Sequence, residues 1–98
     1  SGTGLQISGA QHRVENNVIR NNSTGVGAGT STGSYATGIV ISGNETRNNS
    51  TGVSVSGRTT VENNQVFLNT NGINADQSPL VRNNVVYRNT SNGITASN

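Results

Sequence analysis

The 98-residue chain is long enough for one small domain, and hydrophobic residues make up only 29% of it and charged residues 10%. It has no cysteine, which excludes disulfides and thiolate metal sites, and its net charge of +2 comes from dispersed arginines rather than from the basic stripe that nucleic acid requires. No apolar run approaches the ~20 residues of a membrane-spanning helix, so we expect neither a nucleic-acid partner nor membrane insertion.

A repeated unit begins at Gly4-Leu5 and returns along the whole chain. Its consensus is Val-x-Asn-Asn-x-Val-x-x-Asn-x-x-Gly-Val, where the last two positions are Gly followed by an aliphatic residue. The second Asn of the pair recurs at spacings of 27, 20 and 20 positions, at Asn17, Asn44, Asn64 and Asn84. Matches at so many positions indicate a repeat protein.

The repeat is built from strands. A period near 20 is too short for helical repeats, which need ~33–47 residues, and the apolar residues recur in two-residue steps, as in Val53-x-Val55. A leucine-rich repeat would need several leucines per unit, whereas the chain has three in all. We therefore predict an all-β solenoid of about four to five coils within one domain, 1–98. The predicted repeats are 4–24, 25–51, 52–71, 72–92 and a partial 93–98, with a loop inserted at 27–37.

This pattern, over residues 3 to 96, resembles the right-handed parallel β-helix repeats of the pectate-lyase-like superfamily. The resemblance implies right-handed coils that stack equivalent side chains in ladders about 4.8 Å apart. It carries over no catalytic residues, because the acid-rich motifs of the pectinases, polygalacturonases and alginate epimerases are missing.

Stacked coils place equivalent residues in columns. We expect four inward aliphatic columns: Val14, Ile41, Val61 and Val81; Ile19, Thr46, Val66 and Val86; Leu5, Val26, Val53, Ile73 and Ile94; and Ile7, Ala28, Val55, Ala75 and Ala96. We expect two Asn columns, with the left-handed backbone of the coil turn at the first: Asn17, Asn44, Asn64 and Asn84; and Asn22, Asn49, Asn69 and Asn89. A glycine column is expected to supply a further corner: Gly25, Gly52, Gly72 and Gly93.

Few residues offer chemistry. Glu15 and Glu62 share a column, but Ser42 lies between them, which separates them by two coils. His12 is the only histidine and is expected at the surface, and Asp76 is expected in a turn. We therefore predict no catalytic residue, no metal site, no cofactor and no enzyme activity.

One outward column combines cations with aromatic rings, in the order Arg20, Arg47, Phe67 and Tyr87. Arg47 is expected to stack on Phe67, and Phe67 on Tyr87. The column is either a sugar-binding or subunit-contact strip or a stabilising external stack.

Two functions follow from this architecture. A solenoid whose end coils keep the repeat pattern presents open strand edges, so we expect head-to-tail self-association into a filament through Leu5, Ile7, Ile94 and Ala96. The alternative is a carbohydrate-binding or adhesive module, with a polysaccharide partner, of a larger surface protein or phage spike. The lysine-free surface, rich in Asn, Thr and Gly, favours an extracellular or cell-surface location.

Overall fold

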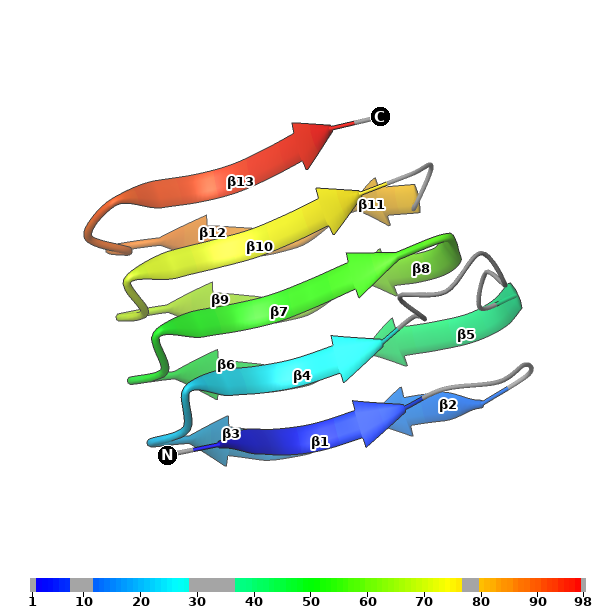
Figure 1. Cartoon of the computed structure of the whole chain (residues 1–98), viewed down its shortest axis with the longest axis horizontal. Helices are drawn as coiled ribbons and strands as arrows, with labels where there is room; N and C mark the ends of the chain where they lie inside the picture. The colour runs from blue at the N-terminus through cyan, green and yellow to red at the C-terminus, as the bar shows by residue number, and fades with distance from the viewer. Residues whose placement is uncertain (1, 8–11, 29–36, 77–79, 98) are drawn as a thin grey trace.

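A computed structural model of the chain describes residues 2–7, 12–28, 37–76 and 80–97, whose regular structure is entirely β-strand (Figure 1). Sheet A contains β1 (Thr3–Ile7), β4 (Thr24–Ala28), β7 (Thr51–Ser56), β10 (Asn71–Asp76) and β13 (Asn92–Ser97). Sheet B contains β2 (Arg13–Glu15), β5 (Thr37–Ser42), β8 (Arg58–Glu62) and β11 (Leu80–Arg82). Sheet C contains β3 (Val18–Arg20), β6 (Glu45–Arg47), β9 (Gln65–Phe67) and β12 (Val85–Tyr87).

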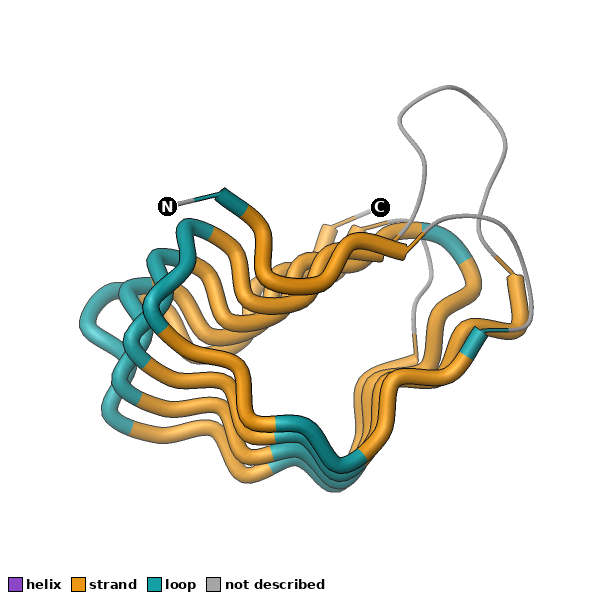
Figure 2. The backbone as a smooth tube through the Cα atoms, turned by 90° about the horizontal axis from the view of Figure 1, so that it is seen from below, coloured by secondary structure: helices purple, strands orange, loops and turns teal. Residues whose placement is uncertain are grey.

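The chain visits the three sheets in turn, so that each strand pairs in parallel with its counterpart one coil away. Figure 1 shows the strands of sheet A lying above one another from the N-terminal to the C-terminal end, and Figure 2 shows the coils nearly superposed along the axis. The fold is a parallel β-solenoid of about four turns, which confirms the predicted fold class.

The strand registers confirm all four predicted inward columns. Val14 pairs with Ile41, for example, and Val26 pairs with Val53. The interior side chains are buried, whereas Leu5, Ile7, Val81 and Val86 at the two ends are only partly buried. Ile94 and Ala96, which were predicted to face inward, keep the register but are exposed because no coil covers them in the described structure. Sequence analysis missed Ile39, which is fully buried in β5 although its two-residue spacing from Ile41 is typical of an inward pair.

The two Asn columns are hydrogen-bonded ladders at the B–C and C–A corners. In the first, the backbone N–H and the Nδ2 of Asn44 both donate to Oδ1 of Asn64, at 2.9 and 3.1 Å. Asn64 donates in the same way to Oδ1 of Asn84, at 3.0 Å for both donors. Each interior Nδ2 also donates to a carbonyl of the preceding coil, as from Asn64 to Ile41 O at 3.0 Å. These bonds satisfy amides that are almost completely buried.

The prediction that the ladder Asn adopts the left-handed backbone was wrong by one residue. Positive φ angles occur at the position just before the first ladder, at Asn16, Gly43, Asn63 and Asn83. They also occur just before the second ladder, at Asn21, Asn48, Leu68 and Arg88. The preceding residue turns the chain, which leaves the ladder Asn free to direct its amide into the corner.

The prediction that the glycine column forms a corner was wrong. Gly25, Gly52 and Gly72 lie within strands β4, β7 and β10, at ordinary φ. A Cβ at Gly25 would lie 2.5 Å from the carbonyl oxygen of Gly52, and one at Gly52 would lie 2.8 Å from that of Gly72. Glycine is needed here because the backbone of the next coil approaches too closely for a side chain.

The predicted loop 27–37 was too long at both ends. Gly27 and Ala28 belong to β4, and Thr37 begins β5. Ala28 is buried in a column with Val55, so it belongs to the core. The remainder of the predicted loop, 29–36, lies outside the described residues.

Candidate functional site

The outward column of sheet C has the predicted order. Arg20 pairs with Arg47, Arg47 with Phe67, and Phe67 with Tyr87 on consecutive strands. The rings of Phe67 and Tyr87 are stacked, with centroids 4.9 Å apart and planes 7° apart, as predicted. Tyr87 is 40% exposed, so the stack presents an aromatic surface to solvent.

The expected stacking of Arg47 on Phe67 is not found among the described ring contacts. Arg47 instead donates from Nε to Oε2 of Glu45 at 2.8 Å. The two residues are two positions apart in β6 and therefore point to the same side of the strand. A charge-assisted hydrogen bond to this carboxylate is stronger than a half-exposed cation–π contact.

A groove of about 660 Å³ follows the C–A corner beside this column, across four coils. Its lining consists of amides, hydroxyls, one apolar residue and one cation: Asn21, Asn22, Ser23, Asn48, Asn49, Ser50, Leu68, Asn69, Thr70, Arg88 and Thr90. None of these lining residues is acidic. The groove is therefore a polar, weakly cationic surface with many hydrogen-bonding groups.

Sequence analysis did not identify this groove. Leu68 and Arg88 hold left-handed backbone, with φ of 58° and 54°, where Asn21 and Asn48 stand in the first two coils. Leu and Arg carry no signal for this conformation. The only signal for the groove in the sequence was that these four residues occupy equivalent positions, each just before a residue of the second Asn column.

The acidic side chains do not converge on a catalytic centre in the described structure. The register places Ser42 between Glu15 and Glu62, as predicted, so the backbone positions of the two residues are roughly 9–10 Å apart along the sheet. Each is paired with its own arginine, Glu15 with Arg13 and Glu62 with Arg82, both at 2.7 Å.

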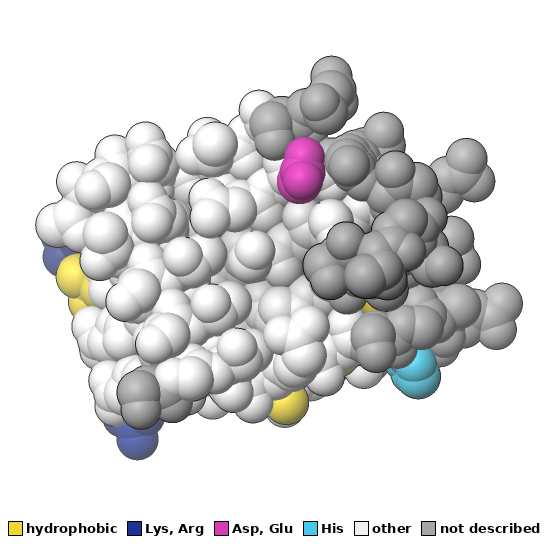
Figure 3. Space-filling model, viewed as in Figure 1, with side chains coloured by type: hydrophobic (Ala, Val, Ile, Leu, Met, Phe, Trp, Pro, Cys, Tyr) yellow, Lys and Arg dark blue, Asp and Glu magenta, His cyan; other side chains and the backbone are white. Residues whose placement is uncertain are grey.

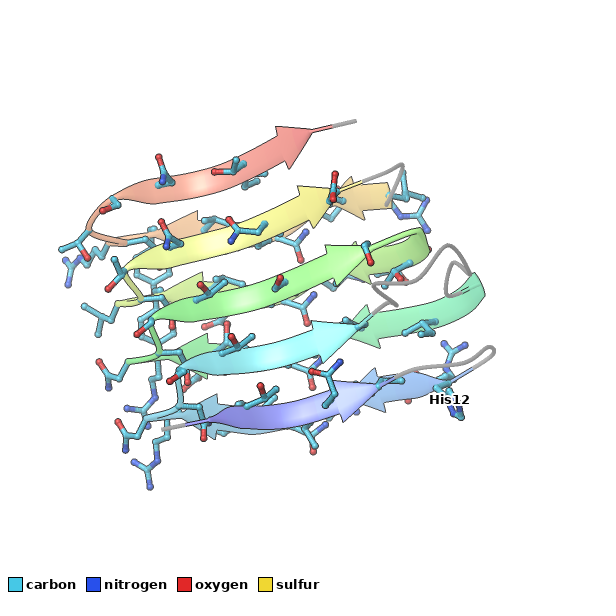
Figure 4. The ribbon with its side chains drawn as sticks, viewed as in Figure 1. His12 is labelled. Carbon is cyan, nitrogen blue, oxygen red and sulfur yellow. The ribbon has the colours of Figure 1, made fainter. Side chains whose placement is uncertain are left out.

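His12 lies just before β2 and is exposed, as predicted (Figure 4). Asp76 was predicted in a turn, but it is the last residue of strand β10, because its backbone continues the ladder with Ser56 and Ser97. The described residues include no group of three or more His, Cys, Asp or Glu side chains suited to a metal ion. They also include no helix with the length and hydropathy needed to cross a membrane.

The two ends of the solenoid present different faces. The predicted contact residues Leu5 and Ile7 are half-buried in β1, and Ile94 and Ala96 are exposed in β13. A hollow at the N-terminal end is lined by residues of β1, of β2 and of the segments beside them: Leu5, Gln6, Ile7, His12, Arg13, Val14, Glu15 and Asn17.

The Asn ladders run in one direction. Within the described chain, each ladder Asn after the first coil accepts hydrogen bonds at Oδ1 from the preceding coil, as Asn44 Oδ1 does from Asn17. Among the described residues, no donor reaches Oδ1 of Asn17 or Asn22 in the first coil, and the backbone N–H groups of Asn84 and Asn89 in the last full coil reach no acceptor. Acceptors therefore face one end and donors the other.

Comparison with protein families matches residues 1–98 to the family described as the right handed beta helix region. Comparisons with curated proteins and with solved structures found no match. The family match confirms the handedness that the sequence resemblance implied. Because the matched region spans the whole sequence, the chain belongs to the right-handed β-helix family.

Proposed function

We propose that this protein is a non-catalytic, extracellular structural solenoid that associates end to end into a filament. The observation that carries this proposal is the direction of the Asn ladders. A second copy placed on the C-terminal end would bring Oδ1 of its Asn17 and Asn22 toward the free N–H groups of Asn84 and Asn89. Such a head-to-tail contact joins two different surfaces and repeats without closing.

The open strand edges support the same association. Among the described strands, β1, β2 and β3 each have one unpaired edge at the N-terminal end, as do β11, β12 and β13 at the other. Unpaired edges with half-buried apolar side chains such as Leu5 and Val81 are ready sites for further pairing. A joint between copies would satisfy the backbone and cover these side chains.

The surface supports a structural role outside the cell. Glu15, Glu45 and Glu62 are each engaged by an arginine rather than gathered around a cleft. The face of sheet A carries hardly any charged or apolar side chains and is built from small polar groups (Figure 3). A lysine-free and cysteine-free chain with this surface suits an exported scaffold.

Sedimentation velocity and negative-stain imaging test the filament. We expect the unaltered protein to form fibres, and Ile7→Arg to stay monomeric because its charge would lie within the joint. Gln6→Arg is the matched control, because Gln6 is exposed and its side chain points to the opposite face of β1. A monodisperse monomer of the unaltered protein at high concentration would contradict the proposal.

A second candidate function is glycan binding, favoured by the exposed Phe67–Tyr87 stack beside a groove that no acidic residue lines. Stacked rings offer an apolar platform, and the groove offers amides and hydroxyls for hydrogen bonds. A glycan array should then show binding that Tyr87→Ala removes and that Gln65→Ala, on the same outer face, retains. An array without hits for the unaltered protein would eliminate this candidate.

A further inference from the structure

The number of strands differs between the sheets. Sheet A has five strands, whereas sheets B and C have four each. The described solenoid therefore begins and ends in sheet A, with β1 and β13. A second copy also begins in sheet A, so a joint brings two sheet A strands to the same place.

The extra strand prevents a close joint. If β1 of a second copy paired with the free edge of β13, its β2 and β3 would lie two rungs beyond β11 and β12. That separation is about 9.6 Å instead of about 4.8 Å. The ladder hydrogen bonds, which are 2.9–3.2 Å long within the chain, could not form across it.

We propose that β13 is an exchangeable strand that blocks assembly until β1 of a second copy replaces it on β10. This inference rests on the proposed end-to-end association. Without β13, the described chain forms four whole coils, and the next copy continues them in register. Leu5 of the second copy would then take the place of Ile94 beside Ile73, and its Ile7 the place of Ala96 beside Ala75.

The structure indicates that β13 leaves rather than β1. Residues 92–96 are all exposed, and Ile94 is 53% exposed, whereas Leu5 and Ile7 are half-buried and pack against the core. Backbone hydrogen bonds hold both strands at their starts: the carbonyl of Gly2 accepts from Ser23 and Thr24, and the N–H groups of Thr90 and Ser91 donate to Asn69 and Thr70. The difference in burial is therefore what distinguishes β13 from β1.

Exchange releases one strand whose residues 92–96 are already exposed, and it completes the other two sheets. β10 keeps a partner, because β1 carries the same Gly-aliphatic-x-aliphatic pattern as β13. Substituting Ile7 for Ala96 also adds apolar surface over Ala75. In addition, β11 and β12 gain partners, and Asn84 and Asn89 gain acceptors. The new interactions therefore exceed those that are lost.

A disulfide that ties β13 to β10 tests the exchange. Asn71 and Asn92 are register partners whose side chains are hydrogen-bonded at 3.0 Å, and the chain has no cysteine of its own. Their Cα atoms, about 4.8 Å apart, lie within disulfide range. We expect the double variant Asn71→Cys and Asn92→Cys, when oxidised, to need a concentration at least about tenfold higher to form fibres. Reduction of the disulfide should restore assembly.

Thr51→Cys combined with Asn71→Cys is the matched control, because it ties the inner strands β7 and β10 in the same column and leaves β13 free. It should assemble in both redox states. A complementary variant, Ile94→Asp, weakens β13 and should assemble at lower concentration than the unaltered protein.

The outcomes separate the two proposals. If the oxidised Asn71–Asn92 variant forms fibres as readily as the control, strand exchange is overturned while end-to-end association stands. If Ile94→Asp assembles at low concentrations at which the unaltered protein is still monomeric, and both assemble at high concentration, strand exchange is supported. If neither protein assembles at any concentration, both proposals fail.

Discussion

Asn64 is the ladder residue whose loss should be most costly. It is 1% exposed, and its side chain takes part in four hydrogen bonds. Its Nδ2 donates to Ile41 O and Asn84 Oδ1, both at 3.0 Å, and its Oδ1 accepts from Asn44 N and Nδ2, at 2.9 and 3.1 Å. Asn64→Ala removes all four bonds and leaves buried partners unpaired.

The expected loss is about 4 kcal/mol of unfolding free energy, because each net hydrogen bond contributes about 0.5–1.5 kcal/mol and unpaired buried groups add to the cost. This is a large part of the roughly 5–15 kcal/mol that stabilises a typical domain. Asn17 occupies the same column but is exposed, and its side chain makes two bonds, to Glu15 O and Asn44 Oδ1. Asn17→Ala should cost only about 1 kcal/mol.

Urea denaturation followed by circular dichroism measures both variants under the same conditions. The comparison isolates burial and bond count, because residue type and column are the same. If Asn64→Ala destabilised the protein no more than Asn17→Ala, the ladders would be a consequence of coil stacking rather than a cause of its stability.

Three further changes test particular contacts by the same denaturation assay. Thr46→Val should add about 1–3 kcal/mol of unfolding free energy, because the Thr46 hydroxyl is buried without a hydrogen-bond partner. Thr59→Val should not stabilise the protein, because it removes a hydrogen bond to the carbonyl of Ser56, and equal effects of the two variants would refute the argument. Leu68→Asn should add about 1 kcal/mol by relieving left-handed strain at φ 58°, and a destabilised variant would contradict this. Gly72→Ala should cost about 2 kcal/mol or more of unfolding free energy, because its Cβ would meet the carbonyl oxygen of Gly93. Gly93→Ala should change the stability little, because its Cβ would lie 3.6 Å from the nearest atom, in Val86. Similar losses for the two variants would argue against close approach as the reason for glycine.

The inward columns could be predicted because they depend on local alternation. In a strand, residues two apart face the same side, so Val53 and Val55 identify themselves as a pair whatever surrounds them. A period of one coil then places each pair over the next. These two properties were sufficient for the fold class and for the stack of Phe67 on Tyr87.

The turn assignments needed coordinates, although one signal was present. In an Asn-Asn pair both residues tolerate left-handed backbone, so composition does not distinguish Asn63 from Asn64. Gly43 before Asn44 was the signal, because glycine marks the first position as the turn. At the second corner, Leu68 and Arg88 offer no comparable signal.

The sequence alone determined the coil length, the side of each strand that faces inward and the Asn columns, since alternation and repetition are properties of the chain itself. The tertiary structure decided why the glycines are needed, that Arg47 pairs with Glu45, and that a groove follows the C–A corner. These features depend on distances between atoms in neighbouring coils or on the exact direction of a side chain, which neither periodicity nor propensity specifies.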